Sequence, residues 1–153
     1  MPRPPARSVA ARVRVLLIDD HALVREGLRA LLEGGEEGIE VVGEAATTDE
    51  GLKAAVALAP DLILLDLSLP GRPAPGLIRA VRASLPKTRV VVLSAMIEER
   101  WVRETVAAGA SGYLLKEVTR QDLVRAIEDA LAGRQVFHPE ARKYVAPIAD
   151  ERP

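Results

Sequence analysis

Four apolar runs of this 153-residue chain end at side chains that could do chemistry. Each run is short and rich in branched aliphatic residues, which is typical of a strand buried on both faces. The polar residues are Asp19 with Asp20, Asp66, Ser94 and Lys116, and the runs before them span 13–18, 62–65, 90–93 and 113–115. Together they offer carboxylates, a hydroxyl that can donate a hydrogen bond and an ammonium group.

Carboxylates gathered in one place repel one another and require a cation. An all-oxygen site with room for water and phosphate suits Mg²⁺. We therefore expect Asp20 and Asp66 to bind Mg²⁺. An aspartate beside a divalent cation can attack phosphorus and form an acyl phosphate, because phosphoryl transfer depends mainly on positioning and charge neutralisation. Asp66 is the expected phosphoacceptor, with Lys116 neutralising charge and Ser94 donating to a phosphoryl oxygen.

The elements that position these residues follow from the spacing of apolar side chains. A further short strand is expected at 39–43, and helical spacing recurs in five segments near 21–33, 49–58, 77–85, 97–108 and 119–132. Asp49 and Thr119 are the expected caps of the second and fifth helices. Such alternation predicts an α/β fold with a parallel, doubly wound sheet. We expect five strands in the flavodoxin-like order 2-1-3-4-5 with five flanking helices.

In an open parallel sheet the carboxyl ends of the strands face one edge, and ligands bind at the switch point, here between strands one and three. Asp19, Asp20, Asp66, Ser94 and Lys116 all lie at such ends. We therefore expect these five side chains to converge in space, although each alone is more often a cap, turn or exposed residue.

Composition narrows the classes of function. The chain has 21 Lys and Arg against 22 Asp and Glu, so its net charge gives no reason to expect nucleic acid as its main partner. It has no cysteine, which excludes disulfides and thiolate metal sites, and two isolated histidines argue against zinc. A cytoplasmic location is expected, and no apolar run is long enough to cross a membrane.

Three regions are expected along the chain. Residues 1–12 are rich in Pro and Arg and read as a disordered tail, 13–133 as the folded domain, and 134–153 as a linker-like tail with at most one turn around 140–144. His138 is expected to be solvated in that tail.

Four motifs appear in order on this frame. They are Leu-Leu-Ile-Asp-Asp-His at 16–21, Leu-Leu-Asp-Leu-Ser-Leu-Pro-Gly at 64–71, Leu-Ser-Ala at 93–95 and Gly-Tyr-Leu-Leu-Lys at 112–116. Each motif alone is weak, but together they are specific. The sequence resembles the response-regulator receiver domains of bacterial two-component systems, and its wording is most similar to the NarL/FixJ subfamily, whose members usually carry a LuxR-type helix-turn-helix.

The resemblance implies further roles. A sensor histidine kinase would phosphorylate Asp66, Asp19 would act on Mg²⁺ through bound water, and the backbone carbonyl of Ser68 would supply another metal ligand. Tyr113 matches the family's aromatic switch position, whose ring moves inward when the hydroxyl of Ser94 engages phosphate. A half-buried strand tyrosine is the alternative. The protein would be a phosphoacceptor rather than a turnover enzyme.

The resemblance also implies a homodimer as a further partner, and DNA only through a C-terminal helix-turn-helix that this sequence lacks. A receiver fragment of a transcription factor is favoured over a stand-alone receiver. A departure lies at Arg72-Pro73-Ala74-Pro75, which is expected to lengthen and stiffen the loop after Asp66. His21 is read as a non-catalytic neighbour and Trp101 as packing.

Two other functions stay open. A pseudo-receiver would use the same fold as a phosphorylation-independent dimerisation or scaffold module, and the complete acidic, hydroxyl and lysine set argues against it. A phosphoaspartate hydrolase would need a substrate pocket and an added acid that this short chain does not offer.

Overall fold

The computed structural model describes residues 12–145, so all of the expected N-terminal tail except Arg12 lies outside the described residues. Strands and helices alternate along this part of the chain. The strands are β1 (Val13–Ile18), β2 (Ile39–Ala45), β3 (Leu62–Asp66), β4 (Arg89–Ser94), β5 (Gly112–Leu115) and β6 (Val136–Phe137). The helices are α2 (Ala22–Glu33), α3 (Thr48–Leu58), α4 (Ala74–Ser84), α5 (Glu99–Ala108), α6 (Arg120–Leu131) and α7 (Pro139–Arg142).

All paired strands are parallel, and the sheet has the order β2-β1-β3-β4-β5-β6. The first five strands therefore lie in the predicted order. The expectation of five strands and five helices is wrong by one of each, because β6 extends the sheet beyond β5 and α7 follows it. A two-residue strand has no periodicity of its own, and its pairing with β5 is what makes it part of the sheet.

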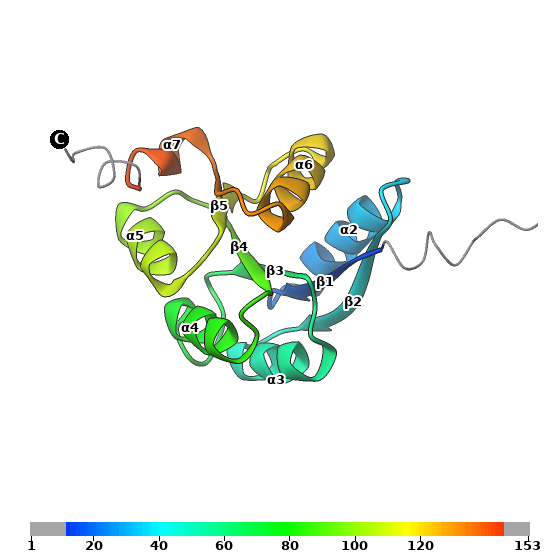
Figure 1. Cartoon of the computed structure of the whole chain (residues 1–153), viewed down its shortest axis with the longest axis horizontal. Helices are drawn as coiled ribbons and strands as arrows, with labels where there is room; N and C mark the ends of the chain where they lie inside the picture. The colour runs from blue at the N-terminus through cyan, green and yellow to red at the C-terminus, as the bar shows by residue number, and fades with distance from the viewer. Residues whose placement is uncertain (1–11, 146–153) are drawn as a thin grey trace, which may run out of the picture.

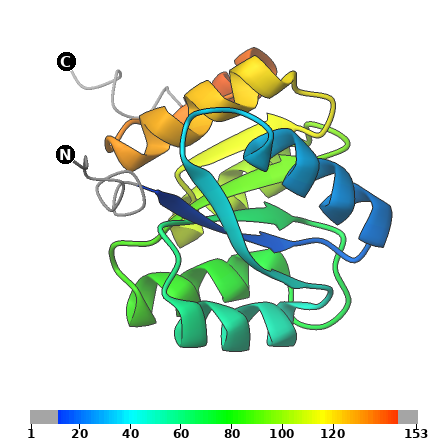
Figure 2. The same ribbon diagram turned by 90° about the vertical axis from the view of Figure 1, so that its right-hand side faces the viewer.

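The helices cover both faces of the sheet (Figures 1 and 2). Side chains alternate along each strand, so successive residues enter different core clusters. One cluster joins strand residues such as Ile63 and Val92 to α3, α4 and α5. The other joins Leu64 and Val91 to α2 and α6. The result is a three-layer α/β fold in which the sheet separates two cores.

Of the two predicted helix caps, one is confirmed and one is wrong. Thr119 caps α6, as predicted, with its Oγ1 accepting from the backbone N–H of Asp122 at 3.1 Å. Asp49 does not cap α3, which corrects that prediction. Thr47 is the cap, and its hydroxyl accepts from the N–H of Glu50 at 3.1 Å. Asp49 lies in the first turn, where a carboxylate also stabilises the helix dipole.

The proline-rich segment after Asp66 is partly helical. α4 begins at Ala74, with Pro75 in its first turn, so the loop is shorter than predicted. Proline fits there because its fixed φ suits a helix and its missing N–H would have had no partner. The loop is tied to α3, since Thr48 Oγ1 donates to the carbonyl of Pro70 at 3.4 Å.

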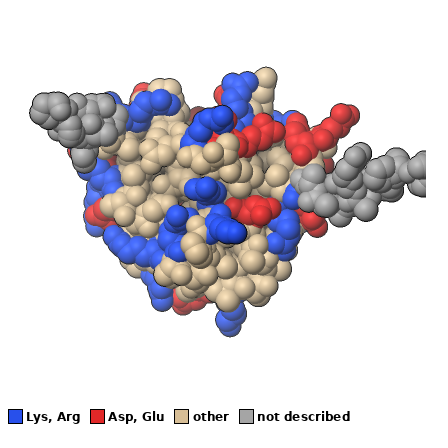
Figure 3. All heavy atoms as spheres, viewed as in Figure 1, with Lys and Arg blue, Asp and Glu red and all other residues tan. Residues whose placement is uncertain are grey.

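Charge is spread over the surface. Basic and acidic side chains are intermixed on the face shown in Figure 3, with acidic ones gathering at the upper right. Among the described helices, none is both long and apolar enough to cross a membrane.

Candidate functional site

Three charged side chains meet at the carboxyl end of the sheet. Lys116 Nζ lies 3.0 Å from Asp19 Oδ2 and 3.1 Å from Asp66 Oδ1. Asp19 and Asp66 are only 3% and 4% exposed. Asp66 ends β3, Asp19 directly follows β1, and the N–H of Lys116 donates to the carbonyl of Ser94 at 2.8 Å. The expected convergence of these residues is therefore present.

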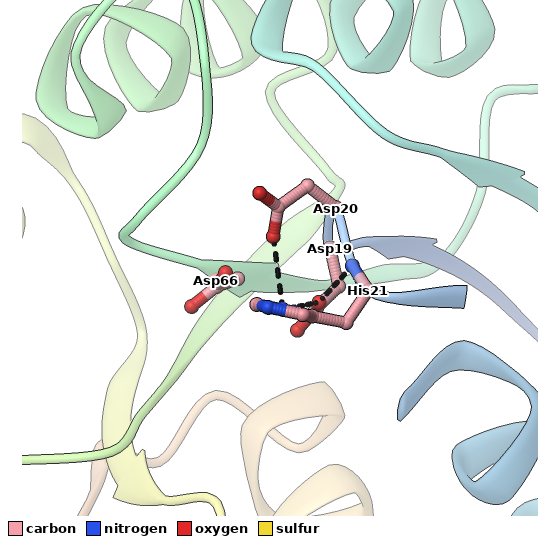
Figure 4. Close-up of side chains that lie close together, drawn as sticks. All are labelled: Asp19, Asp20, His21 and Asp66. Carbon is pink, nitrogen blue, oxygen red and sulfur yellow. Dashed lines mark hydrogen bonds and ion pairs between the residues drawn. The ribbon is translucent and has the colours of Figure 1, made fainter. Parts of the chain in front are cut away.

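The carboxylates lie close enough to share a cation. One ligand atom each of Asp19, Asp20, His21 and Asp66 lies within 4.8 Å of the others. Figure 4 shows these side chains together. His21 Nδ1 is 3.0 Å from Asp20 Oδ1 and 3.4 Å from Asp19 Oδ1. His21, which sequence reasoning set aside, is thus part of the cluster and also the N-cap residue of α2.

Asp66 retains a carboxylate oxygen with no hydrogen-bond partner in the described part of the chain. Its Oδ2 is buried and accepts no hydrogen bond from the described residues. A buried carboxylate oxygen without a partner is unfavourable unless a cation or another group satisfies it. With two further carboxylates at hand, the donor set fits Mg²⁺, which prefers oxygen ligands and keeps several waters.

Lys116 is held in its charged form. Burial alone would lower the pKa of its ammonium group, but hydrogen bonds to Asp19 and Asp66, together with their negative charges, outweigh burial and raise the pKa above its ordinary value. The site therefore contains a fixed positive charge at neutral pH.

Ser94 and Tyr113 lie on the same side of the site. Ser94 Oγ accepts from the N–H of Met96 at 3.2 Å, and the Tyr113 hydroxyl donates to the carbonyl of Met96 at 3.0 Å. Tyr113 is fully buried, so its ring lies inward. Burial raises the pKa of the Tyr113 phenol, and a hydrogen bond with Ser94 opposes that rise. Both proposed switch residues therefore hydrogen-bond to Met96, which lies in the loop after β4.

A pocket of about 420 Å³ opens beside Asp66. Asp66, Ser94, Lys116, Ser68 and His21 contribute polar groups to its wall. The other residues that line it are Leu67, Ala95, Met96, Glu98, Trp101 and Tyr113. Sequence reasoning missed Glu98 and placed Trp101 in general packing. Helical periodicity predicts which face of a helix is buried. It does not predict which side chains near the start of the helix face a neighbouring pocket.

His138 has a structural role that the sequence did not indicate. Its Nδ1 accepts from the N–H of Glu140 at 3.0 Å and caps α7. His138 is therefore partly exposed and also caps a helix.

Comparisons with known proteins found one matching family and several similar proteins. Residues 15–128 match the family described as response regulator receiver domain. The chain is 38% identical over 126 residues to the transcriptional regulatory protein MctR of Rhizobium johnstonii, covering 82% of this chain and 58% of that protein. It is 40% identical over 123 residues to the nitrate/nitrite response regulator protein NarL of Escherichia coli, covering 80% and 56%.

A solved structure is similar over most of its length. The two-component response regulator of the LuxR family from an Aurantimonas species has a TM-score of 0.81 and 34% identity, covering 89% of this chain and 96% of that one. The chain spans just over half the length of the two curated relatives named above.

Proposed function

This chain belongs to the response regulator receiver domain family, and we propose that Asp66 is the residue on which it accepts a phosphoryl group. Receiver domains of this kind switch conformation on phosphorylation. The observation that carries the assignment to Asp66 is its asymmetric environment. One carboxylate oxygen is held by Lys116, while the other is buried without a partner among the described residues, and the residue lines an open pocket.

In the proposed reaction, an oxygen of the Asp66 carboxylate forms a bond to phosphorus as the bond from phosphorus to a kinase histidine nitrogen breaks. The electron pair leaves with that nitrogen, and the product is an acyl phosphate on Asp66. Lys116 stays protonated and donates to a phosphoryl oxygen, which stabilises the charge that spreads over those oxygens in the transition state.

We assign the Mg²⁺ ligands to Asp19, Asp20, Asp66 and the backbone carbonyl of Ser68, with Asp19 acting through water. When bound, Mg²⁺ would neutralise charge on the transferring phosphoryl group. The clustering of three carboxylates supports the assignment. The closeness of Ser68 to Asp66 on the pocket wall supports the role of its carbonyl.

Ser94 and Tyr113 are the proposed switch. Once Asp66 carries a phosphoryl group, the Ser94 hydroxyl would donate to one of its oxygens and draw the loop after β4 toward the site. Tyr113 would follow this loop, because its hydroxyl binds the carbonyl of Met96. The position of the Tyr113 ring would then depend on the state of Asp66.

Partners and location follow from the family and remain part of the proposal. The phosphodonor would be a sensor histidine kinase in the cytoplasm, where ATP for such a kinase is found. Homodimer formation, and DNA binding through a C-terminal helix-turn-helix domain beyond this chain, would be the output.

Acetyl phosphate tests the assignment. With Mg²⁺, the intact protein should gain the mass of one phosphoryl group, and Asp66→Asn should abolish the gain. Chelation of Mg²⁺ should slow the reaction strongly. Asp61→Asn is the matched control, because Asp61 lies just before the opposite end of β3, and it should react like the unchanged protein.

An adduct that persists in Asp66→Asn would show that another residue is the phosphoacceptor. No adduct at all, with a partner that binds the unchanged protein and Asp66→Asn equally, would favour the scaffold function instead.

A further inference from the structure

Residues 134–145, termed the C-terminal segment, dock on the edge of the sheet. In Figure 1 the segment runs from α6 past β5 to α7. The N–H of Val136 donates to the carbonyl of Ser111 at 2.9 Å, and that of His138 donates to the carbonyl of Tyr113 at 2.9 Å. Phe137 and Ala141 are 8% and 0% exposed, so the segment is packed against the domain as well as hydrogen-bonded to it.

The sequence of β5 makes room for this docking. A Cβ atom on Gly112 would lie 2.3 Å from the backbone carbonyl oxygen of Val136, closer than real Cβ atoms come to such an atom. The backbone of Val136 therefore occupies the place of a side chain at position 112. Any larger residue there would force β6 away from β5.

Tyr113 contacts both the segment and the candidate site. It pairs with Phe137 in the parallel register, so the two side chains stand on the same face of the sheet. Both belong to one core cluster, which also contains Ala141. At the other end of the ring, the Tyr113 hydroxyl donates to the carbonyl of Met96 in the loop that Ser94 begins.

We propose that the edge of β5 is a docking surface for the C-terminal segment, and that docking is coupled to the occupation of Asp66 through Tyr113. An inward ring fills the cluster beneath Phe137 and Ala141, whereas a ring that leaves would remove their packing partner. A phosphoryl group that holds Ser94 and Tyr113 inward would therefore tighten the segment. This inference rests on the proposed function of Asp66.

Coupling of this kind is reciprocal. If an occupied Asp66 strengthens docking by some factor, then release of the segment must weaken binding at Asp66 by the same factor, and couplings between sites are commonly about 5- to 150-fold. The docked segment is therefore expected to raise the affinity of the site, although none of its residues lines the pocket beside Asp66.

Amide hydrogen exchange of the full chain tests the coupling. The probe is beryllofluoride with Mg²⁺, a phosphoryl analogue whose binding is followed by fluorine NMR. The analogue should slow exchange in residues 136–145 at least fivefold, and Tyr113→Ala should remove this difference. Bound analogue with unchanged exchange in the unmodified chain would overturn the coupling. Failure of the analogue to bind that chain would instead overturn the role of Asp66, and the coupling with it.

Two variants test the reciprocal effect. Gly112→Ala should displace β6, and Ala141→Glu should release α7 by placing a charge in a fully buried position. Each should speed exchange of the segment and raise the dissociation constant of the analogue at least fivefold. Gly27→Ala is the matched control, because its Cβ meets nothing within 4 Å. An unchanged dissociation constant in both variants, with the segment released, would refute the coupling.

Discussion

Lys116 is the residue on which the electrostatics of the site depend most. Its ammonium group is the cation that separates the buried carboxylates of Asp19 and Asp66. Loss of one partner of a buried ion pair leaves an uncompensated charge, which costs more than the pair contributes. The two carboxylates would then repel one another with no ammonium group between them, which would disturb the Asp66 oxygen that we propose attacks phosphorus.

Lys116→Met should therefore slow phosphorylation by acetyl phosphate by roughly a hundredfold, the usual effect of removing one donor that stabilises developing charge. A time course by intact mass, in excess Mg²⁺, measures it. Lys53→Met, which removes an exposed lysine of α3, should react at the original rate. Equal phosphorylation rates for the two variants would show that Lys116 does not take part in the reaction.

The residues of the site could be predicted because they all lie at the carboxyl ends of strands, where the topology forces them together. The closeness of Asp66 and Lys116 could be predicted from the sequence alone. The positions of His21 and Trp101 could be seen only in the structure. His21 turns back onto Asp19 and Asp20, and Trp101 faces the pocket, through side-chain orientations that spacing along the chain does not determine.

At the scale of elements, ion pairs of Glu44 connect β2 to α2. Arg25 Nε and Arg29 Nη2 each lie 2.8 Å from a Glu44 carboxylate oxygen. Hydrogen bonds from Arg29 and then Arg25 lower the pKa of Glu44 below its ordinary value of 4.5, against the opposing effect of burial. Since the folded-state pKa is the lower one, these contacts stabilise the fold fully above about pH 4.5. Their contribution is lost as the pH falls through the folded-state pKa.

Glu44→Gln should lower the free energy of unfolding at neutral pH by about 1 kcal/mol, since the pair is partly exposed. Urea unfolding at several pH values should show the difference from the unchanged protein shrinking below about pH 4.5. Glu26→Gln, at an exposed position of α2, should show no such trend. A difference that grows in acid would contradict the predicted sign.

The end of α3 contains a strained residue. Ala59 has φ of 46°, the left-handed region, just before Pro60. A side chain with a Cβ is disfavoured in that region, and glycine is the usual residue at such a helix end. Ala59→Gly should raise the free energy of unfolding by about 0.5–1 kcal/mol. Ala107→Gly, at an exposed position inside α5, should lower it by about 1 kcal/mol. Thermal unfolding of the two variants would show opposite shifts, and a destabilised Ala59→Gly would refute the strain.

Element existence was easier to predict than element ends. The runs at 13–18 and 62–65 are strands because they are apolar, apart from Arg14, and stop at charged residues. The cap of α3 was placed at Asp49 because two threonines and an aspartate in a row all fit that role. β6 was missed because a two-residue segment has no periodicity, and Val136 and Phe137 become a strand only by pairing with β5.

At the scale of the whole molecule, the sheet continues past Gly133. A chain that ends at Gly133 would lose the buried side chains of Val136, Phe137 and Ala141 and expose the edge of β5. Burial of the two larger of these side chains, Val136 and Phe137, contributes roughly 3–6 kcal/mol. The shortened chain should unfold at lower urea by a corresponding amount. It should also self-associate at high concentration, because a free edge strand pairs readily.

A chain that ends at Val145 keeps the entire C-terminal segment and should match the full chain in urea unfolding and in size-exclusion chromatography. Equal stability of the chains ending at Gly133 and Val145 would show that β6 adds nothing to the fold.

The sheet divides the interior into two cores that share no side chain. Tyr113 and Phe137 belong to the core under α3, α4 and α5, while their neighbours Leu114 and Val136 belong to the core under α2 and α6. A substitution that repacks the core under α2 and α6 therefore leaves the cluster that contains Tyr113 in place. Repacking beneath α2 and α6 and repacking around Tyr113 are therefore separable changes, one on each face of the sheet.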